Sequence, residues 1–159
     1  TMFTPPDEIK NECVPTTPEL QGIVHDPLAR GLKGLSGNAG LFSSTDDLAK
    51  LCQLLLNNGV YDGDRYLNEE TIREFTKKYS GKSSRAIGFD TRSGDNPSSG
   101  QYFSEVTYGH LGYTGTSIWI DPVRDIFVVF LTNRVYPDDT ASIRSTRPKV
   151  YDTVILSLN

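Results

Sequence analysis

The stretch Tyr108–Arg134 constrains the fold more than any other part of this chain. It contains the longest apolar run, the single Trp and one of the two His. Within it, Ser117, Trp119 and Asp121 alternate with isoleucines, and this period of two is typical of a half-buried strand. The run 126–131 is continuous, rich in β-branched and aromatic residues and too short for an ordinary helix, so it predicts a strand covered on both faces. We therefore expect an antiparallel hairpin.

Turn residues and glycines complete this hairpin. Asp121-Pro122 and Arg124-Asp125 predict the turn between its two strands. Just before it, glycines recur every third residue, at Gly109, Gly112 and Gly115. A glycine has no Cβ, so the backbone at these positions can approach a ligand closely.

Helical patterns flank the predicted strands. The clearest helix is 45–57, with Ser44 or Thr45 as its cap and Asn57-Asn58-Gly59 as its stop. A second helix is predicted at 69–79 after Asn68, and a third follows Ser145 or Thr146. The inward-facing residues predicted for these helices are Leu48, Leu51, Cys52 and Leu55, then Ile72 and Phe75, and finally the stripe Val150, Val154 and Leu158.

Shorter signals lie between these helices. Residues 61–66 read as a tight turn between extended pieces, and Ala86–Asp90 is a short strand candidate. Residues 1–24 hold four prolines and few apolar residues, which predicts an extended arm or loop. The pattern as a whole predicts an α+β fold: an antiparallel sheet of about 3–4 strands with helices packed on it.

Composition bounds the function. The 159 residues suit one domain, and the hydrophobic fraction of 36% is low for a self-sufficient core. The net charge of −4 argues against nucleic-acid binding, and no apolar run reaches the length of a membrane span. The two cysteines are too few for a disulfide framework. The Gly-rich segment 31–42 lacks the order of a phosphate-binding loop. We expect no metal or cofactor.

Several motifs then point to a family. Gly-His-Leu-Gly-Tyr-Thr-Gly at 109–115, followed by Ile-Trp-Ile-Asp-Pro at 118–122 and Leu-Thr-Asn at 131–133, resembles the third-motif strand of the serine β-lactamase superfamily. That superfamily includes class C β-lactamases, DD-peptidases and related esterases, and its Lys-Thr-Gly triplet often becomes His-x-Gly in the esterase-like branch. The segment 37–49 resembles another of its signatures. The match covers Val24–Leu158 and implies that residues 25–159 are the C-terminal portion of an incomplete β-lactamase-like fold.

One departure from the family is decisive. The family nucleophile lies in Ser-x-x-Lys upstream of these motifs, and this sequence contains no Ser-x-x-Lys. Literal matches to the second motif at 66–68 and 36–38 stand in the wrong order, and Asn68 is better explained as a helix cap. We therefore expect a missing N-terminal half of the same protein as partner, an isolated chain without activity, and dimers or higher oligomers through exposed edges and apolar patches.

The resemblance assigns roles to individual residues. His110 takes the place of the family's Lys and would polarise the site or relay a proton. The backbone N–H of Tyr113 would join the oxyanion hole. The residues expected to bind substrate are Gly112, Thr114, Gly115, Asn38, Asn133 and His25. Two alternatives stay open: His110 only forms a hydrogen bond to a neighbouring strand, and His25-Asp26 is a turn in which Asp26 caps the backbone rather than a catalytic pair.

The expected activity follows from these roles. The chain would contribute one wall to a serine hydrolase acting on a small acyl, ester or amide substrate. Leu111 replaces a hydroxyl residue that would bind a substrate carboxylate, which favours esterase-like or amidase-like chemistry over β-lactam recognition. The family implies a periplasmic or secreted location. The alternative is a non-catalytic accessory module of a larger protein, for instance a carbohydrate-active one.

Overall fold

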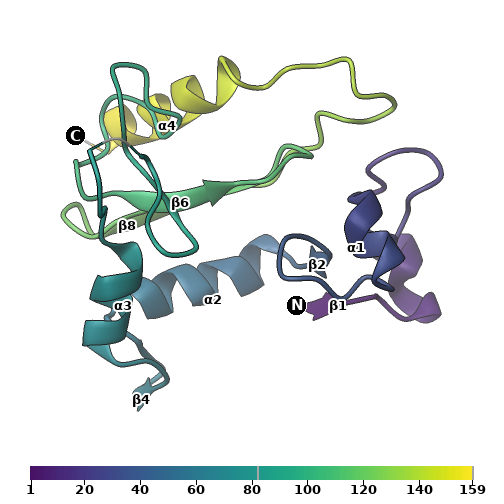
Figure 1. Ribbon diagram of the computed structural model, residues 1–159, viewed down its shortest axis with the longest axis horizontal. Coiled ribbons are helices and arrows are strands. Elements are labelled where there is room, and N and C mark those ends of the chain that lie inside the picture. Colours follow the sequence, from purple (N-terminus) through teal and green to yellow (C-terminus); the bar gives the residue numbers. More distant parts are fainter. Residues whose placement is uncertain (82, 159) are drawn as a thin grey trace.

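The computed structural model, which describes residues 1–81 and 83–158, is built around one antiparallel sheet. Its four strands lie in the order β5 (Asp90–Thr91), β6 (Tyr108–Leu111), β7 (Ser117–Asp121) and β8 (Ile126–Phe130). Helix α4 (Thr146–Ser157) covers one face of the sheet, and helix α2 (Thr45–Leu56) lies against the other (Figure 1). The predicted α+β class with a small antiparallel sheet is confirmed.

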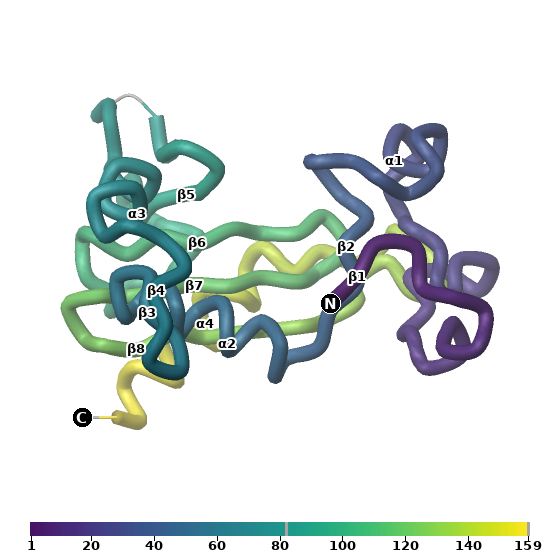
Figure 2. Tube along the Cα trace, turned by 90° about the horizontal axis from the view of Figure 1, so that it is seen from below, coloured from purple at the N-terminus to yellow at the C-terminus, as the bar shows by residue number. Residues whose placement is uncertain are grey.

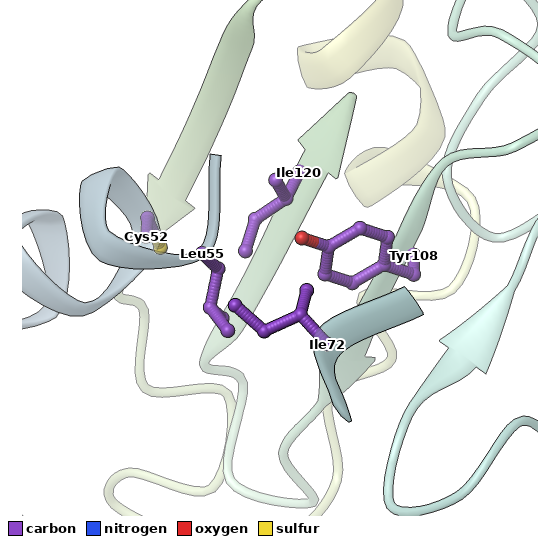
Figure 3. Packing of buried hydrophobic residues seen from close by; sticks show 5 residues of the cluster. All are labelled: Cys52, Leu55, Ile72, Tyr108 and Ile120. Atoms are coloured by element: carbon purple, nitrogen blue, oxygen red, sulfur yellow. The ribbon is translucent and has the colours of Figure 1, made fainter. Parts of the chain in front are cut away.

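Strand β7 is buried on both faces. Trp119 and Ile120 are both 0% exposed, and because neighbouring side chains of a strand point to opposite faces, they lie in two separate clusters. The cluster on the α4 face consists of Phe103, Trp119, Tyr151 and Ile155. The cluster on the α2 face consists of Cys52, Leu55, Ile72, Tyr108 and Ile120 (Figure 3).

The predicted hairpin forms as expected. Strands β7 and β8 pair from Ser117 with Phe130 to Asp121 with Ile126, and side chains of β8 pack against both clusters. The turn is tied by the buried carboxylate of Asp121, which accepts hydrogen bonds from the backbone N–H groups of Val123 (3.0 Å) and Arg124 (3.2 Å). The strand prediction for 126–131 is confirmed to within one residue.

Glycine is required at position 109 by the packing of the sheet. Gly109 pairs with Trp119, and a Cβ built on Gly109 would lie 2.1 Å from the carbonyl oxygen of Ile118 and 2.8 Å from the Trp119 ring. The two strands can therefore lie at their observed spacing only when residue 109 lacks a side chain. This contact within the sheet, rather than the approach of a ligand, explains the glycine.

Helix α2 begins and ends close to the predicted residues. The Ser44 side chain accepts a hydrogen bond from the backbone N–H of Asp47 at 3.2 Å, as capping-box spacing predicts. The helix ends at Leu56, and the chain then leaves it through Asn58 and Gly59 at positive φ. Of the predicted apolar face, Cys52 and Leu55 are buried, whereas Leu51 is 42% exposed.

The segment between α2 and β6 agrees with the sequence in part. Strands β3 (Val60–Tyr61) and β4 (Asp64–Arg65) form a hairpin whose two turn residues both have positive φ, the geometry that suits the strand twist. Helix α3 (Glu69–Thr76) follows Asn68 but ends three residues before the predicted residue 79. The strand candidate 86–90 is wrong except at its last residue, because Gly88 at φ 80° interrupts the extended chain and β5 pairs only through Asp90–Thr91.

Helix α4 corrects the predicted apolar stripe. The residues that it buries are Arg147, Tyr151 and Ile155 instead of Val150, Val154 and Leu158. The helix is turned this way because the Tyr151 ring packs against Trp119 and Phe130, and its hydroxyl is hydrogen-bonded to Ser117. Within the described residues, no helix is long and apolar enough to cross a membrane.

The first 42 residues gather at one end of the molecule, opposite α3 and the β3–β4 hairpin (Figure 2). Strand β1 (Met2–Phe3) pairs with β2 (Leu41–Phe42), and between them lie the 3-10 helix η1 (Asp7–Glu12) and helix α1 (Pro27–Gly31). The pairing of β1 with β2 brings the two ends of this segment together. Asn133, which follows β8, ties the segment to the rest of the fold by donating a hydrogen bond to the Pro15 carbonyl oxygen at 2.7 Å.

The sheet contact at Gly109 predicts a sharp difference between two identical substitutions. Gly109→Ala should lower the free energy of unfolding by about 3 kcal/mol or more, because the added Cβ meets backbone and indole atoms that cannot move aside. Gly37→Ala, where a Cβ meets nothing within 4 Å, should change it by less than about 0.5 kcal/mol. Urea denaturation followed by circular dichroism measures both. Equal midpoints for the two variants would contradict the observed spacing of β6 and β7.

The α2-side cluster predicts a loss of stability in alkali. Burial raises the pKa of Tyr108 from 10.0 to about 12 and that of Cys52 from 9.0 to about 11. The unfolded chain therefore releases these protons at lower pH than the folded chain, so the free energy of unfolding falls as pH rises from 9.0 to about 12. In denaturant titrations, Tyr108→Phe should flatten the upper part of this fall, whereas Tyr66→Phe at an exposed position should not. An unchanged slope in Tyr108→Phe would count against the prediction.

Candidate functional site

A cavity of about 790 Å³ lies between the N-terminal segments and the β6–β7 hairpin. Its walls come from residues 16–42 and 110–116, two parts of the chain that are far apart in sequence. We call it the His110 cavity. Six of the predicted site residues line it: His25, Asn38, His110, Gly112, Tyr113 and Thr114.

His110 comes from strand β6, where it pairs with Ile118. Its Nε2 atom lies 2.9 Å from Nη1 of Arg85. A guanidinium group can only donate hydrogen bonds, so Nε2 is the acceptor and the neutral ring carries its proton on Nδ1. The sequence left a purely structural hydrogen bond as the alternative role of His110. The hydrogen bond to Arg85 is such a structural bond, although its partner is a side chain and not a neighbouring strand.

Sequence reasoning missed Arg85. It stands 25 residues before His110, and no motif marks it. The folded chain brings the two together because Arg85 bridges to Asp90 and Asp90 pairs with Gly109, the neighbour of His110. The signal that would have found Arg85 is therefore strand pairing, which a single sequence does not reveal.

The loop 112–116, which joins β6 to β7, has all of its carbonyl groups engaged. Nη2 of Arg147 donates to the carbonyl oxygens of Gly112 at 2.7 Å and Thr116 at 3.1 Å. The other three carbonyls are held from the segment after β8: Tyr113 O by Arg134 Nε (2.7 Å), Thr114 O by the Arg134 backbone N–H (2.8 Å) and Gly115 O by Thr132 Oγ1 (2.7 Å). In contrast, none of the hydrogen bonds found within residues 1–81 and 83–158 uses the backbone N–H of Tyr113.

The Tyr113 side chain forms part of the cavity wall and is held from three directions. The ring of His25 stacks on it with 5.8 Å between centroids, and the Arg134 guanidinium lies 4.4 Å from its centroid. Its hydroxyl donates a hydrogen bond to Asp139, which also pairs with Arg134. The hydrogen bond from Tyr113, assisted by Arg134, lowers the pKa of Asp139 below its usual value. The carboxylate therefore stays charged and holds the ring in place.

His25 and Asp26 do not act as a pair. Asp26 caps helix α1, where its Oδ1 accepts a hydrogen bond from the Ala29 N–H at 2.8 Å, and this bond lowers the pKa of Asp26. The His25 Nδ1 atom instead lies 3.1 Å from Thr16 Oγ1. The reading of Asp26 as a backbone cap is confirmed, and His25 faces the His110 cavity without an acidic partner on its own segment.

The other predicted residues are placed differently. Asn38 lines the His110 cavity and accepts a hydrogen bond from Ser36 Oγ at 2.5 Å. Asn133 lines a neighbouring cavity of about 470 Å³ instead. Gly115, at φ 127°, packs against Thr132, whose carbonyl oxygen would lie 2.7 Å from an added Cβ. The structure therefore does not bring Gly115 and Asn133 into the His110 cavity.

The described lining of the cavity holds two histidines, three threonines and the free backbone N–H of Tyr113. None of the described residues that line it is a serine, a cysteine or a lysine. Within the described ranges, no three His, Cys, Asp or Glu side chains gather closely enough to hold a metal ion. These residues can orient and polarise a bound carbonyl group, but none of them can form an acyl-serine intermediate with it.

Comparison with known proteins gives this arrangement a context. The family model described as "Beta-lactamase" matches residues 1–150. The chain is 38% identical over 142 residues to a protein of Escherichia coli (strain K12) named "Putative D-alanyl-D-alanine carboxypeptidase", and 36% identical over 143 residues to the protein of that name from Salmonella gallinarum. These matches cover 86% and 88% of the chain but 32% and 33% of the relatives. The chain thus spans about a third of the length of the curated relatives that it matches.

A solved structure agrees with these relatives. The fold resembles the crystal structure of a β-lactamase from Mycobacterium bovis with a TM-score of 0.59 and 26% sequence identity. The similarity covers 75% of this chain and 46% of the other. The matched part of this chain thus corresponds to less than half of that protein.

The bond between Arg85 and His110 predicts the tautomer of the histidine. We expect the neutral ring as the Nδ1–H form, visible in long-range proton–nitrogen correlation spectra recorded under mildly alkaline conditions. Arg85→Met removes the donor to Nε2 and should shift the ring toward a mixture of the two forms. Arg73→Met, an exposed arginine of α3, serves as the control. Identical His110 spectra in Arg85→Met and in the unsubstituted chain would disprove the assignment.

Proposed function

The chain belongs to the β-lactamase family, and on that basis we propose that it forms one wall of the acyl-transfer site of a serine hydrolase. In this proposal it contributes the His-x-Gly motif through His110 and the oxyanion donor through Tyr113. The attacking serine comes from a part of the protein outside these 159 residues. The chain alone is inactive.

One observation carries the proposal. His110 and Tyr113 line the same cavity, the Tyr113 N–H has no acceptor among the described residues, and the described lining contains no serine. A backbone N–H left free beside a histidine suits a developing oxyanion. Loss of one such donor typically costs about 2.7–4 kcal/mol of transition-state stabilisation, so the free N–H is worth maintaining.

The proposed reaction divides the work between two parts of the protein. A serine Oγ adds to the substrate carbonyl and its proton passes to a base; the carbonyl oxygen becomes the oxyanion that the Tyr113 N–H binds. The C–O or C–N bond of the leaving group then breaks, and the leaving group takes up a proton. Water repeats the sequence on the acyl-enzyme. His110 acts in proton transfer or polarisation, with its ring orientation fixed by Arg85.

Leu111 bears on the substrate. Leu111 follows His110 on β6 and lines the cavity. It occupies the position at which the family motif has a hydroxyl residue. An isobutyl group offers no hydrogen bond to a carboxylate, so we propose a small ester or amide rather than a β-lactam or a peptide ending in D-alanine. The names of the relatives point to D-alanyl-D-alanine peptides, and a carboxypeptidase assay would separate the two classes.

The partner in this proposal is the remaining part of the same protein. The chain spans about a third of its curated relatives and matches 46% of the M. bovis structure. Large apolar side chains are exposed on the segment 28–41, which supplies part of the cavity wall: Leu28, Leu32, Leu35 and Leu41. A preceding domain that carries the nucleophile would cover such residues.

A second function rests on the same lining. Because the described wall of the cavity holds no serine, cysteine or lysine, the chain also suits a non-catalytic module attached to another enzyme. The two functions differ in what precedes Thr1. Ser-x-x-Lys in the preceding coding region supports the hydrolase, and its absence supports the module.

Covalent labelling tests the hydrolase directly. A protein extended through the preceding coding region should react with a fluorophosphonate probe, whereas the 159-residue chain should not. In the extended protein, His110→Ala should slow labelling by about 10²-fold or more, since a positioned acid–base group typically contributes that much. Lys149→Ala, at an exposed position of α4, should leave the rate unchanged. Labelling of the short chain, or of His110→Ala at the full rate, would falsify the proposed roles.

A further inference from the structure

Arg147 is a buried cation without a counter-ion. The residue is 7% exposed, its Nε atom is buried without a partner, and none of the ion pairs among the described residues involves it. Burial lowers its pKa, which reflects the cost of removing the charge from water. It also stands in the first turn of α4, where the helix dipole disfavours a positive charge. Only its hydrogen bonds to two loop carbonyl groups offset this cost among the described contacts.

The contacts of Arg147 lie at the two ends of the loop 112–116. Its Nη2 atom donates to Gly112 O at 2.7 Å and to Thr116 O at 3.1 Å, and the Gly112 N–H donates to Thr116 O at 2.7 Å. A single guanidinium thus closes the base of the loop from the α4 side. It lines a separate cavity of about 570 Å³ on that side, and no residue of α4 lines the His110 cavity.

The planarity of the peptide bond converts this contact into control of the Tyr113 N–H. The Gly112 carbonyl and the Tyr113 N–H belong to one trans peptide group, so they point in opposite directions. Because Arg147 holds the carbonyl toward α4, the N–H points away from α4. A charged donor on the carbonyl also polarises the peptide group and makes its N–H a stronger donor.

We infer that Arg147 is a positioning residue for the oxyanion site: it orients and polarises the Gly112–Tyr113 peptide, so that the Tyr113 N–H is presented to the His110 cavity. This inference rests on the proposed function, since it takes that N–H to be the oxyanion donor. Arg134 has the matching contact on the next peptide, where its Nε donates to Tyr113 O at 2.7 Å. The side of the loop that faces away from the cavity is thus held by two guanidinium groups.

Nitrogen-15 spectra of the 159-residue chain test the orientation of this peptide without any activity. The Tyr113 amide should give one sharp resonance in the unsubstituted chain. In Arg147→Met it should shift and broaden, because the carbonyl loses its charged donor and the peptide can rotate. Arg144→Met is the matched control: Arg144 lines the same cavity but makes no hydrogen bond to the loop within the described part of the chain. Added guanidinium ion, at concentrations that do not unfold the chain, should restore the resonance in Arg147→Met.

Other outcomes of the spectra overturn the inference. An unshifted Tyr113 amide in folded Arg147→Met would remove the positioning role. Loss of the Trp119 and Ile155 signals together with that of Tyr113 would show that Arg147 only docks α4 on the sheet. If Arg147→Met does not fold, Arg147→Lys decides: it keeps the charge but lacks the fork, and an unchanged Tyr113 resonance there would also contradict the inference.

Kinetics of the extended protein separate this inference from the proposed function. With a chromogenic ester, Arg147→Met should lower kcat by about 10²-fold with little change in KM, the pattern expected when an interaction made in the transition state is lost. An extended protein without any labelling or turnover would refute the proposed function, while the spectra would still decide what Arg147 does. Full kcat in Arg147→Met would refute the positioning role in an active enzyme.

Discussion

The burial of strand β7 on both faces is the constraint on which the rest of this structure depends. Trp119 and Ile120 stand next to each other and are both fully buried, so the strand needs a helix on each side. Helices α2 and α4 meet this need. The same burial fixes the register of the sheet, because a slip by one residue would exchange the two faces and put a side chain other than glycine against Trp119.

A fixed register has direct consequences for the site. His110 follows Gly109 on β6, so the pairing of Gly109 with Trp119 fixes the position of His110 along the strand, opposite Ile118. The loop that follows begins and ends on paired strands and is held by arginines on the side away from the cavity. Groups carried by such elements keep their geometry better than groups on free loops, which catalysis by oriented dipoles requires. The N-terminal segment then closes the cavity with His25 and Asn38.

Local signals let the sequence predict much of this. The period of two around Trp119, the cap at Ser44 and the turn residues after Asp121 act over a few residues, and the elements that they predict are present. Tertiary packing decided the rest. The buried face of α4 follows Tyr151, whose ring and hydroxyl find partners on β7, so an apolar count along the helix selected the wrong stripe.

The site divides in the same way. His110 and Tyr113 stand in a motif that can be read from neighbouring residues, whereas Arg85 and Arg147 act on that motif from 25 and 35 residues away. The contact of Arg85 depends on strand pairing, and that of Arg147 depends on where α4 packs on the sheet. No local pattern in a single sequence encodes these two tertiary features. Asn133 also shows the limit of a motif: it follows the family order, yet its amide donates to Pro15 rather than facing His110.

The energetics of the loop bear on which function the fold serves. A buried cation without a counter-ion at a helix N-terminus is unfavourable, and its two bonds to loop carbonyl groups offset part of this cost. A module that only holds two proteins together would use the Arg147 bonds to the loop carbonyl groups for stability, but it would not need a particular orientation of the Tyr113 N–H. A site that must bind negative charge for the lifetime of a transition state gains from both features, because the guanidinium fixes the peptide and the free N–H meets the charge. The guanidinium contact and the free N–H belong to the two ends of one peptide group, beside the histidine of the motif, and this coincidence favours acyl transfer over the accessory module.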